Sequence, residues 1–143
     1  MFANSVHLID YFNIFCRGEL KNIEVQNSPI GHQSKVTSAQ LEFTSGDTGI
    51  YTGVWNTAGF WSVKITTGAQ LLELRPLEQL MQQIYPERKA NLIAQDGLSD
   101  LKPGLQAQAA EFLRALSFRD HKLPSISDYL VTSDLVAKIY RNN

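Results

Sequence analysis

Apolar and polar residues alternate over residues 36–44, and this alternation is the clearest pattern in the chain. Successive side chains of a strand point to opposite faces, so Leu41 and Phe43 share one face while Gln40 and Glu42 share the other. The pattern predicts a half-buried strand of an antiparallel sheet. The same alternation predicts further strands at 20–26, 50–56, 60–66 and 70–75.

Short turns are expected to join these strands into a meander. Residues 27–31 are rich in turn-forming residues, 45–49 fit a hairpin loop, and Gly59 and Gly68 mark two more turns. Pro76 lacks the N–H that a ladder needs, so it ends or interrupts the strand at 70–75. Residues 77–84 fit a short helix and a last strand equally, and 85–104 has the composition of a loop.

The two faces of this predicted sheet differ in composition. One is continuously apolar and consists of Leu41, Phe43, Tyr51, Trp55, Trp61, Val63, Leu72 and Leu74. The other mixes polar side chains with Val36, Ile50, Val54, Phe60 and Leu71. A slip of one residue in register would exchange the faces, so the sequence leaves open which of them the helices cover. We expect the uncovered face to form a homodimer or higher homo-oligomer, because it is too apolar for simple exposure to water.

Three helices are expected beside the sheet. Residues 4–16 are apolar around nearly the whole helix and should be buried, with Gly18 just beyond the end. Residues 105–116 carry an apolar stripe opposite a polar one, and a capping sequence at 125–128 starts a last helix with a stripe at Val131, Leu135 and Ile139. The order predicts an α+β fold, an open and mainly antiparallel β-sheet with helices packed on one face, as a single domain over 1–143.

Composition and charge narrow the function classes. The net charge is −1 with scattered basic residues, which argues against nucleic-acid binding. No apolar run approaches the ~20 residues that cross a bilayer, so no membrane span is expected. Cys16 is the only cysteine and no signal peptide is evident, which favours the cytoplasm. The histidines His7, His32 and His121 are far apart in sequence, so no metal site is expected.

His7 and Asp10 are the main candidates for chemistry, because residues three apart are neighbours on one side of a helix. An imidazole suits proton transfer near neutral pH, which makes His7 a candidate catalytic residue; it also fits a histidine that bonds the backbone at a helix start. Asp10 fits a residue that orients His7, and fits better one that ties the helix to its neighbours. Asn4 fits both a substrate contact and a helix cap.

The same stretch resembles the start of the C-terminal domain in one oxidoreductase family. His7-Leu8-Ile9-Asp10, an apolar run and Gly18-Glu19 are similar to that of the glucose–fructose oxidoreductase, inositol dehydrogenase and rhizopine-catabolism family. The resemblance continues in order over essentially the whole chain, at Gly53-Val54-Trp55-Asn56, Gly59-Phe60-Trp61, Leu74-Arg75-Pro76-Leu77-Glu78, Gly104-Leu105-Gln106-Ala107-Gln108, Glu111-Phe112 and the helix from Asp128 to Tyr140.

The resemblance implies a substrate-binding and oligomerising domain of an NAD(P)-dependent oxidoreductase that acts on a sugar, a cyclitol or a related polyol. The family histidine lies beside the substrate near the nicotinamide, which implies that His7 binds a substrate hydroxyl and relays its proton. Asn4 and Asp10, beside His7 at the start of the helix, are the candidate substrate-binding residues. The NAD or NADP of the parent enzyme would be held by its own nucleotide-binding (Rossmann) domain, which is this chain's expected partner.

Two departures from the family pattern change the expectation. The glycines of this chain form no Gly-x-Gly-x-x-Gly turn, so a nucleotide-binding domain is absent and the chain alone should bind no cofactor and show no dehydrogenase activity. Ala3 stands where many members carry an aspartate ahead of the histidine, which argues against the usual histidine–carboxylate relay. The alternative function is a non-enzymatic sheet module that dimerises or holds a partner.

Overall fold

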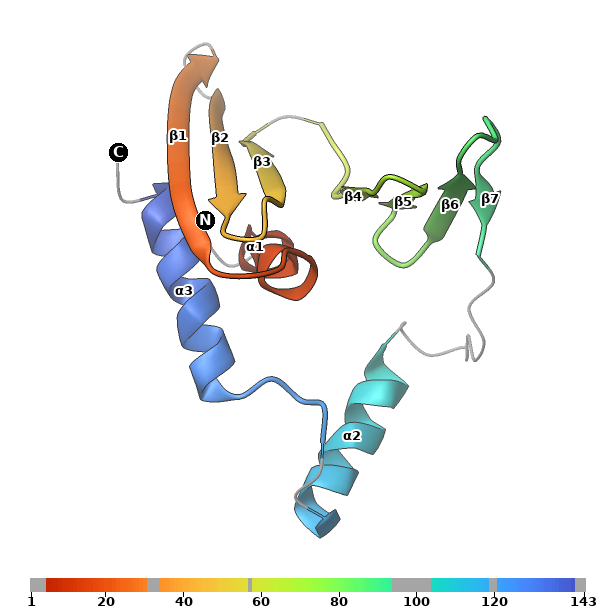
Figure 1. Cartoon of the computed structure of the whole chain (residues 1–143). Coiled ribbons are helices and arrows are strands. Elements are labelled where there is room, and N and C mark those ends of the chain that lie inside the picture. The colour runs from red at the N-terminus through yellow and green to blue at the C-terminus, as the bar shows by residue number, and fades with distance from the viewer. Residues whose placement is uncertain (1–4, 31–33, 57, 94–103, 119–120, 141–143) are drawn as a thin grey trace. The chain divides into compact units, whose positions relative to one another are not determined.

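Figure 1 shows the computed structural model of the chain, which describes residues 5–30, 34–56, 58–93, 104–118 and 121–140. Contacts between Cα atoms divide the chain into two compact units. Unit 1 comprises Met1–Phe60 with Asp128–Asn143, and unit 2 comprises Trp61–Ser127. Each unit has an antiparallel sheet of its own, so the α+β class with open antiparallel sheets is confirmed.

Unit 1 is built on a three-stranded sheet. Its helices and strands are α1 (Ser5–Phe15), β1 (Leu20–Ile30), β2 (Ser34–Phe43), β3 (Thr48–Val54) and most of α3 (Ile126–Tyr140). The strands pair in the order β1-β2-β3 (Figure 1). In the register of this sheet, Leu41 of β2 lies opposite Ile23 and Gly49, and Ala39 lies opposite Val25 and Tyr51.

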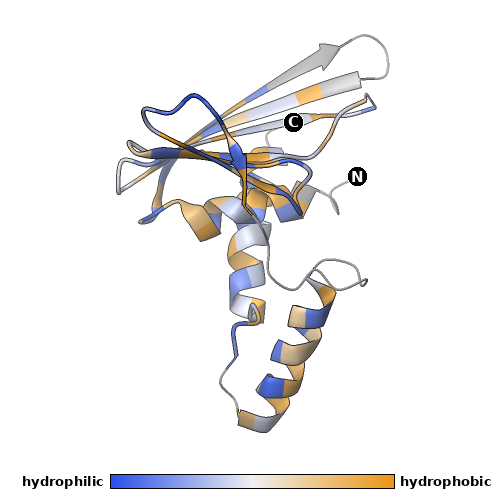
Figure 2. Cartoon of the chain, turned by 90° about the vertical axis from the view of Figure 1, so that its right-hand side faces the viewer, coloured by the Kyte–Doolittle hydropathy of each residue, from blue (hydrophilic) through white to orange (hydrophobic). Residues whose placement is uncertain are grey.

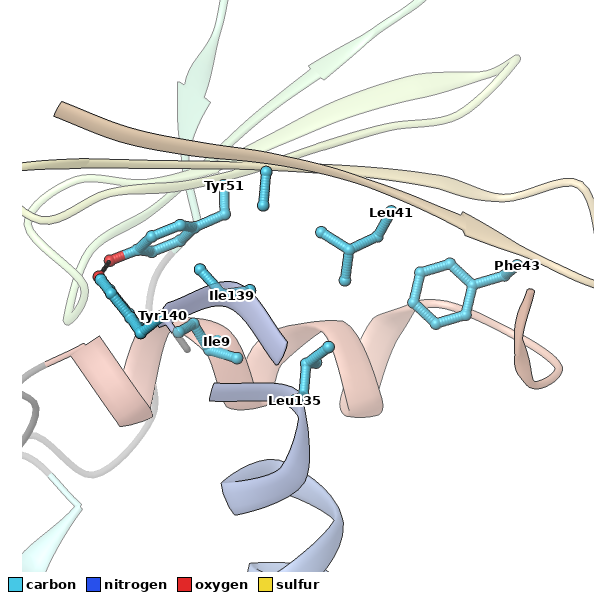
Figure 3. Packing of buried hydrophobic residues seen from close by; sticks show 8 residues of the cluster. Ile9, Leu41, Phe43, Tyr51, Leu135, Ile139 and Tyr140 are labelled. Atoms are coloured by element: carbon cyan, nitrogen blue, oxygen red, sulfur yellow. Dashed lines mark hydrogen bonds between the residues drawn. The ribbon is translucent and has the colours of Figure 1, made fainter. Parts of the chain in front are cut away.

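The alternation of β2 separates a buried face from an exposed one, as predicted. Ala39, Leu41 and Phe43 are buried on the inner face, whereas Ile50 on the outer face of β3 is 73% exposed. The helices α1 and α3 cover the inner face (Figure 3). The buried hydrophobic cluster consists of Ile9, Ala39, Leu41, Phe43, Tyr51, Leu135, Ile139 and Tyr140.

Gly49 allows α1 to lie close to β3. A Cβ at this position would stand 2.6 Å from Cε1 of Phe12, which is far closer than a carbon–carbon contact allows. The hydroxyls of Tyr51 and Tyr140 form a buried hydrogen bond of 2.6 Å (Figure 3). The inner face of the sheet thus combines close apolar packing with one buried polar pair.

Three expectations for unit 1 are wrong in detail. α1 is not buried all round, because the sheet and α3 cover only part of it and Ile14 remains 60% exposed. The buried stripe of α3 begins at Thr132 and not at Val131, since both phases fit the same helical spacing with Leu135 and Ile139. Residues 27–30 continue β1 instead of turning, and Pro29 is tolerated there because β1 is an edge strand.

Unit 2 has a four-stranded antiparallel sheet and one helix. The strands are β4 (Val63–Thr66), β5 (Gln70–Leu74), β6 (Leu80–Ile84) and β7 (Asn91–Leu92), and the helix is α2 (Leu105–Phe118). The order of the strands is β4-β5-β6-β7. Val63 pairs with Leu74 and Leu74 with Leu80, so these side chains share one face, as predicted for Val63, Leu72 and Leu74.

The strands of unit 2 differ from the sequence pattern at their ends. β4 begins at Val63 although the pattern favours a start at residue 60, and residues 80–84 of the undecided stretch form β6. The short strand β7 lies in the predicted loop 85–104, because pairing with β6 decides such a strand and its own composition does not. β5 ends at Leu74, before Pro76, as the missing N–H predicts.

α2 forms where its periodicity predicts a helix, but its apolar stripe is not buried within unit 2. Figure 2 shows hydrophobic residues recurring along α2, and the helix has no buried residue. Phe112 is 56% exposed and Leu116 is 70% exposed. Periodicity identifies the apolar side of a helix without fixing what it meets, and within unit 2 this side is not buried.

Candidate functional site

Two of the three residues predicted for a site, His7 and Asp10, lie on α1. His7 is in the first turns of the helix and its side chain is exposed. Within the described part of the chain, its imidazole has no hydrogen-bond or ion-pair partner, so it stands open to solvent or to a bound molecule. Asn4 lies outside the described residues. The structure thus places His7 on an accessible part of the helix.

Asp10 lies one turn further along α1 and is committed to a hydrogen bond with α3. The hydroxyl of Thr132 donates to Oδ1 of Asp10 at 2.5 Å. The amide of Asn13 donates to the same hydroxyl oxygen at 3.0 Å. Thr132 is 3% exposed, so this three-residue network bridges two helices at the edge of the hydrophobic core.

The network favours the structural function of Asp10 over that of a partner for His7. The Asp10 carboxylate accepts a hydrogen bond from the Thr132 hydroxyl, and this bond links α1 to α3. The sequence pattern gave no reason to single out Thr132 or Asn13. The signal that could have found Thr132 is its spacing, because positions 132, 135 and 139 share one helical face and a threonine on an otherwise apolar face needs a partner.

The C-terminal end of α1 is fixed to the β2–β3 hairpin. Arg17 donates from its backbone N–H and from Nε to Oδ2 of Asp47, at 2.8 and 3.0 Å, and its other guanidinium nitrogen lies 2.7 Å from Oδ1. These bonds hold the pKa of the Asp47 carboxyl well below its usual range. Gly18 has a φ of 76°, and a Cβ there would stand 2.5 Å from Oγ1 of Thr44, so glycine is required where the chain leaves the helix.

The remaining chemistry of the described residues is sparse. Burial raises the pKa of the Cys16 thiol and the charge of Asp47 adds to this effect, which disfavours the reactive thiolate. Among the described residues, no three of His, Cys, Asp and Glu gather as metal ligands. No helix in the described ranges is long and apolar enough to cross a membrane. The imidazole of His7 is accessible, and an imidazole is a group that can transfer protons near neutral pH.

Comparisons with known proteins bear on the fold. No protein-family model matches the chain, and no curated protein sequence matches it. Two solved structures match nearly its whole length. A dehydrogenase from Chromobacterium violaceum matches over 97% of this chain and 44% of its own, with 17% identity and a TM-score of 0.79. A protein assigned as an NADPH-dependent oxidoreductase from Desulfitobacterium hafniense matches over 99% of this chain and 46% of its own, with 12% identity and a TM-score of 0.70. The chain thus has the fold of somewhat less than half of each of these two oxidoreductase chains.

Proposed function

We propose that the chain is the substrate-binding and oligomerising domain of an NAD(P)-dependent oxidoreductase of the glucose–fructose oxidoreductase, inositol dehydrogenase and rhizopine-catabolism family. Its substrate would be a sugar, a cyclitol or a related polyol. The observation that carries the proposal is the fold match, which covers 97% and 99% of this chain but less than half of two oxidoreductase chains. A catalytic domain of such an enzyme needs a second domain for the cofactor, and a match of this extent fits one domain of two.

The cofactor would not be held by this chain. Dinucleotides bind at a glycine-rich turn that leads from a strand into a helix, where backbone N–H groups face the pyrophosphate. No glycine-rich turn of this kind occurs in the sequence. The chain's own contribution would be a wall of the substrate pocket, with the nicotinamide supplied from the nucleotide-binding domain as hydride acceptor or donor.

His7 would act as the general base for the substrate hydroxyl. Oxidation of an alcohol to a carbonyl breaks the C–H bond with its electron pair and releases the hydroxyl proton, which needs an acceptor. The exposed imidazole at the start of α1 is available for that proton, since Asp10 behind it already accepts the hydroxyl of Thr132. In the reverse direction His7 would return the proton to the developing alkoxide.

Replacing His7 in the full enzyme tests this assignment. We expect His7→Ala to lower turnover by about 10²–10⁴-fold, the range for a general acid–base group, with an unchanged melting temperature. His121→Ala is the matched control, because His121 is also exposed and is not among the residues proposed for the site. Turnover of His7→Ala within a few-fold of the parent enzyme would show that His7 is not catalytic.

Self-association through the outer face of the three-stranded sheet completes the proposal. Ile50 and Val54 on this face are 73% and 45% exposed, and burying such side chains is favourable by about 25 cal/mol per Å². A stable interface would cover at least ~1,000 Å² in total. Sedimentation at micromolar concentration should show a dimer or larger oligomer that Ile50→Lys dissociates and Ile84→Lys in unit 2 does not. A monomeric parent chain would refute this interface.

A further inference from the structure

The contact between α1 and α3 contains one polar network inside an apolar surface. Thr132 of α3 is 3% exposed, and Ile9 of α1 and Leu135 of α3, both members of the buried hydrophobic cluster, are 0% and 5% exposed. Its hydroxyl accepts from Asn13 and lies within bonding distance of two acceptors, Oδ1 of Asp10 at 2.5 Å and the Asp128 carbonyl at 3.3 Å. The shorter distance identifies Asp10 as the principal acceptor.

Such a network fixes a helix in a way that apolar contact does not. Hydrophobic burial is non-directional, so the apolar contacts of Ile9 and Phe12 do not by themselves set the rotation of α1, and the Arg17–Asp47 contact fixes only its C-terminal end. Hydrogen bonds depend on distance and angle, and a single buried polar group is a documented means of specifying the register of packed helices. Asp10 and Asn13 are three residues apart, so the Thr132 hydroxyl forms hydrogen bonds with two successive turns on one side of α1.

His7 lies on this side of α1 as well, one turn before Asp10. Any rotation of the helix about its axis moves His7 together with Asp10, and a slip by one residue shifts it by about 1.5 Å along the axis. A displacement of about 1 Å at a reacting group can lower a rate by about 10²-fold. The network and the proposed catalytic imidazole are therefore connected through one rigid turn of helix.

We propose that Thr132, through its bonds to Asp10 and Asn13, is a positioning residue for His7. The inference rests on the proposed function, because the position of His7 has a purpose only if this residue meets a substrate. Thr132 itself touches neither substrate nor cofactor in this proposal. From α3, Thr132 would fix the rotation of α1 about its axis and the position of α1 along that axis. Both determine where the imidazole of His7 meets the substrate hydroxyl.

Two substitutions separate positioning from mere stability. Thr132→Val keeps the volume and removes the hydroxyl, whereas Thr132→Ser keeps the hydroxyl and removes a buried methyl. In the full enzyme, assayed with NAD or NADP and with myo-inositol and D-glucose as probe polyols, Thr132→Val should lower kcat about 10- to 100-fold with KM changed by less than about three-fold. Thr132→Ser should keep kcat within about three-fold of the parent despite a lower melting temperature. Thr52→Val, at an exposed threonine of β3, is the matched control.

Amide hydrogen exchange in the 143-residue chain gives a readout that does not depend on catalysis. Thr132→Val should speed exchange in α1 about ten-fold relative to β2, and Thr132→Ser should leave that ratio unchanged. If Thr132→Val and Thr132→Ser have equal kcat while the His7→Ala enzyme is inactive, Thr132 does not position His7. If His7→Ala retains full activity, or neither probe polyol is turned over by the parent enzyme, the proposed function fails. In that case the ratio of amide exchange in α1 to that in β2 still tests whether the Thr132 hydroxyl fixes α1. The same ratio in Thr132→Val and Thr132→Ser would show that it does not.

Discussion

The two units of this chain each contain an antiparallel sheet but differ in how they bury apolar side chains. In unit 1, the inner face of β1-β2-β3 is covered by α1 and α3, and Ile9, Leu41 and Ile139 are completely buried. In unit 2, no described residue between Trp61 and Ser127 is buried, although the sheet has an apolar face and α2 an apolar stripe. Backbone ladders therefore form in both units, but among the described residues only those of unit 1 add a buried hydrophobic core.

The difference shows that sheet pairing and core formation are separate contributions. On folding, the hydrogen bonds of a ladder replace bonds to water and contribute modestly to net stability. Burial of apolar area is the dominant favourable contribution to the free energy of folding. Unit 1 should hold the most stable part of the chain. Unit 2 should gain stability from any surface that covers its sheet or α2.

The sharpest test compares the central strand of each sheet. Amides of β2 should exchange with solvent at least ~100-fold more slowly than amides of β5, because opening unit 1 requires exposure of its core. Hydrogen-exchange mass spectrometry or NMR of the chain measures this difference directly. Equal protection of β2 and β5 would mean that both units open in one cooperative step, and the contrast between them would be lost.

Removing a buried leucine should cost far more in unit 1 than the same change in unit 2. Leu41→Ala should lower the free energy of unfolding by about 2–5 kcal/mol, because Leu41 is 0% exposed and leaves a cavity. Leu116→Ala in α2 should change it by no more than about 0.5 kcal/mol, since that leucine is 70% exposed. Denaturant titration of both variants gives the comparison, and similar losses would show that α2 is covered in solution.

Adding one methyl group tests the close approach of α1 to β3. Gly49→Ala places a Cβ 2.6 Å from Phe12 and should destabilise the protein by about 1–3 kcal/mol through overpacking. Gly68→Ala in unit 2 meets no atom within 4 Å and is the matched control. A thermal melt in which both variants behave alike would mean that α1 does not press on β3.

The smallest expected effect concerns the Arg17–Asp47 contact at the end of α1. The folded-state pKa of Asp47 is lowered, so the contact stabilises the fold fully above the unfolded aspartate pKa of about 3.9 and loses this stabilisation as pH falls below it. Asp47→Asn should therefore lower the melting temperature at pH 7, and the gap to the parent should narrow below about pH 4. Asp134→Asn, at an exposed i,i+4 pair with Lys138, is the control. If the difference in melting temperature between the parent and Asp47→Asn widens on acidification, the Arg17–Asp47 contact does not stabilise the fold through the ionised Asp47.

Most of the scaffold follows from the sequence by itself. The alternation over 36–44 fixes which side chains of β2 share a face, and α1, β2 and β3 end or begin within two residues of the boundaries that Gly18 and the hairpin at 45–49 predict. The capping sequence places Ser125 directly before α3. These features depend on neighbours along the chain, because the helical and strand periods and the turn residues are local properties.

Only the tertiary structure decided what each face meets. The sequence left open which sheet face is covered and whether the buried stripe of α3 includes Val131 or Thr132. In the structure, the covered face is the one with Leu41 and the buried stripe includes Thr132. It also assigned Asp10 to Thr132, a residue 122 positions away in the chain. Periodicity identifies residues that lie side by side on one element, but the partner of that element is set by packing among segments far apart in sequence. For this reason α2 could be predicted as an amphipathic helix and its exposed stripe could not.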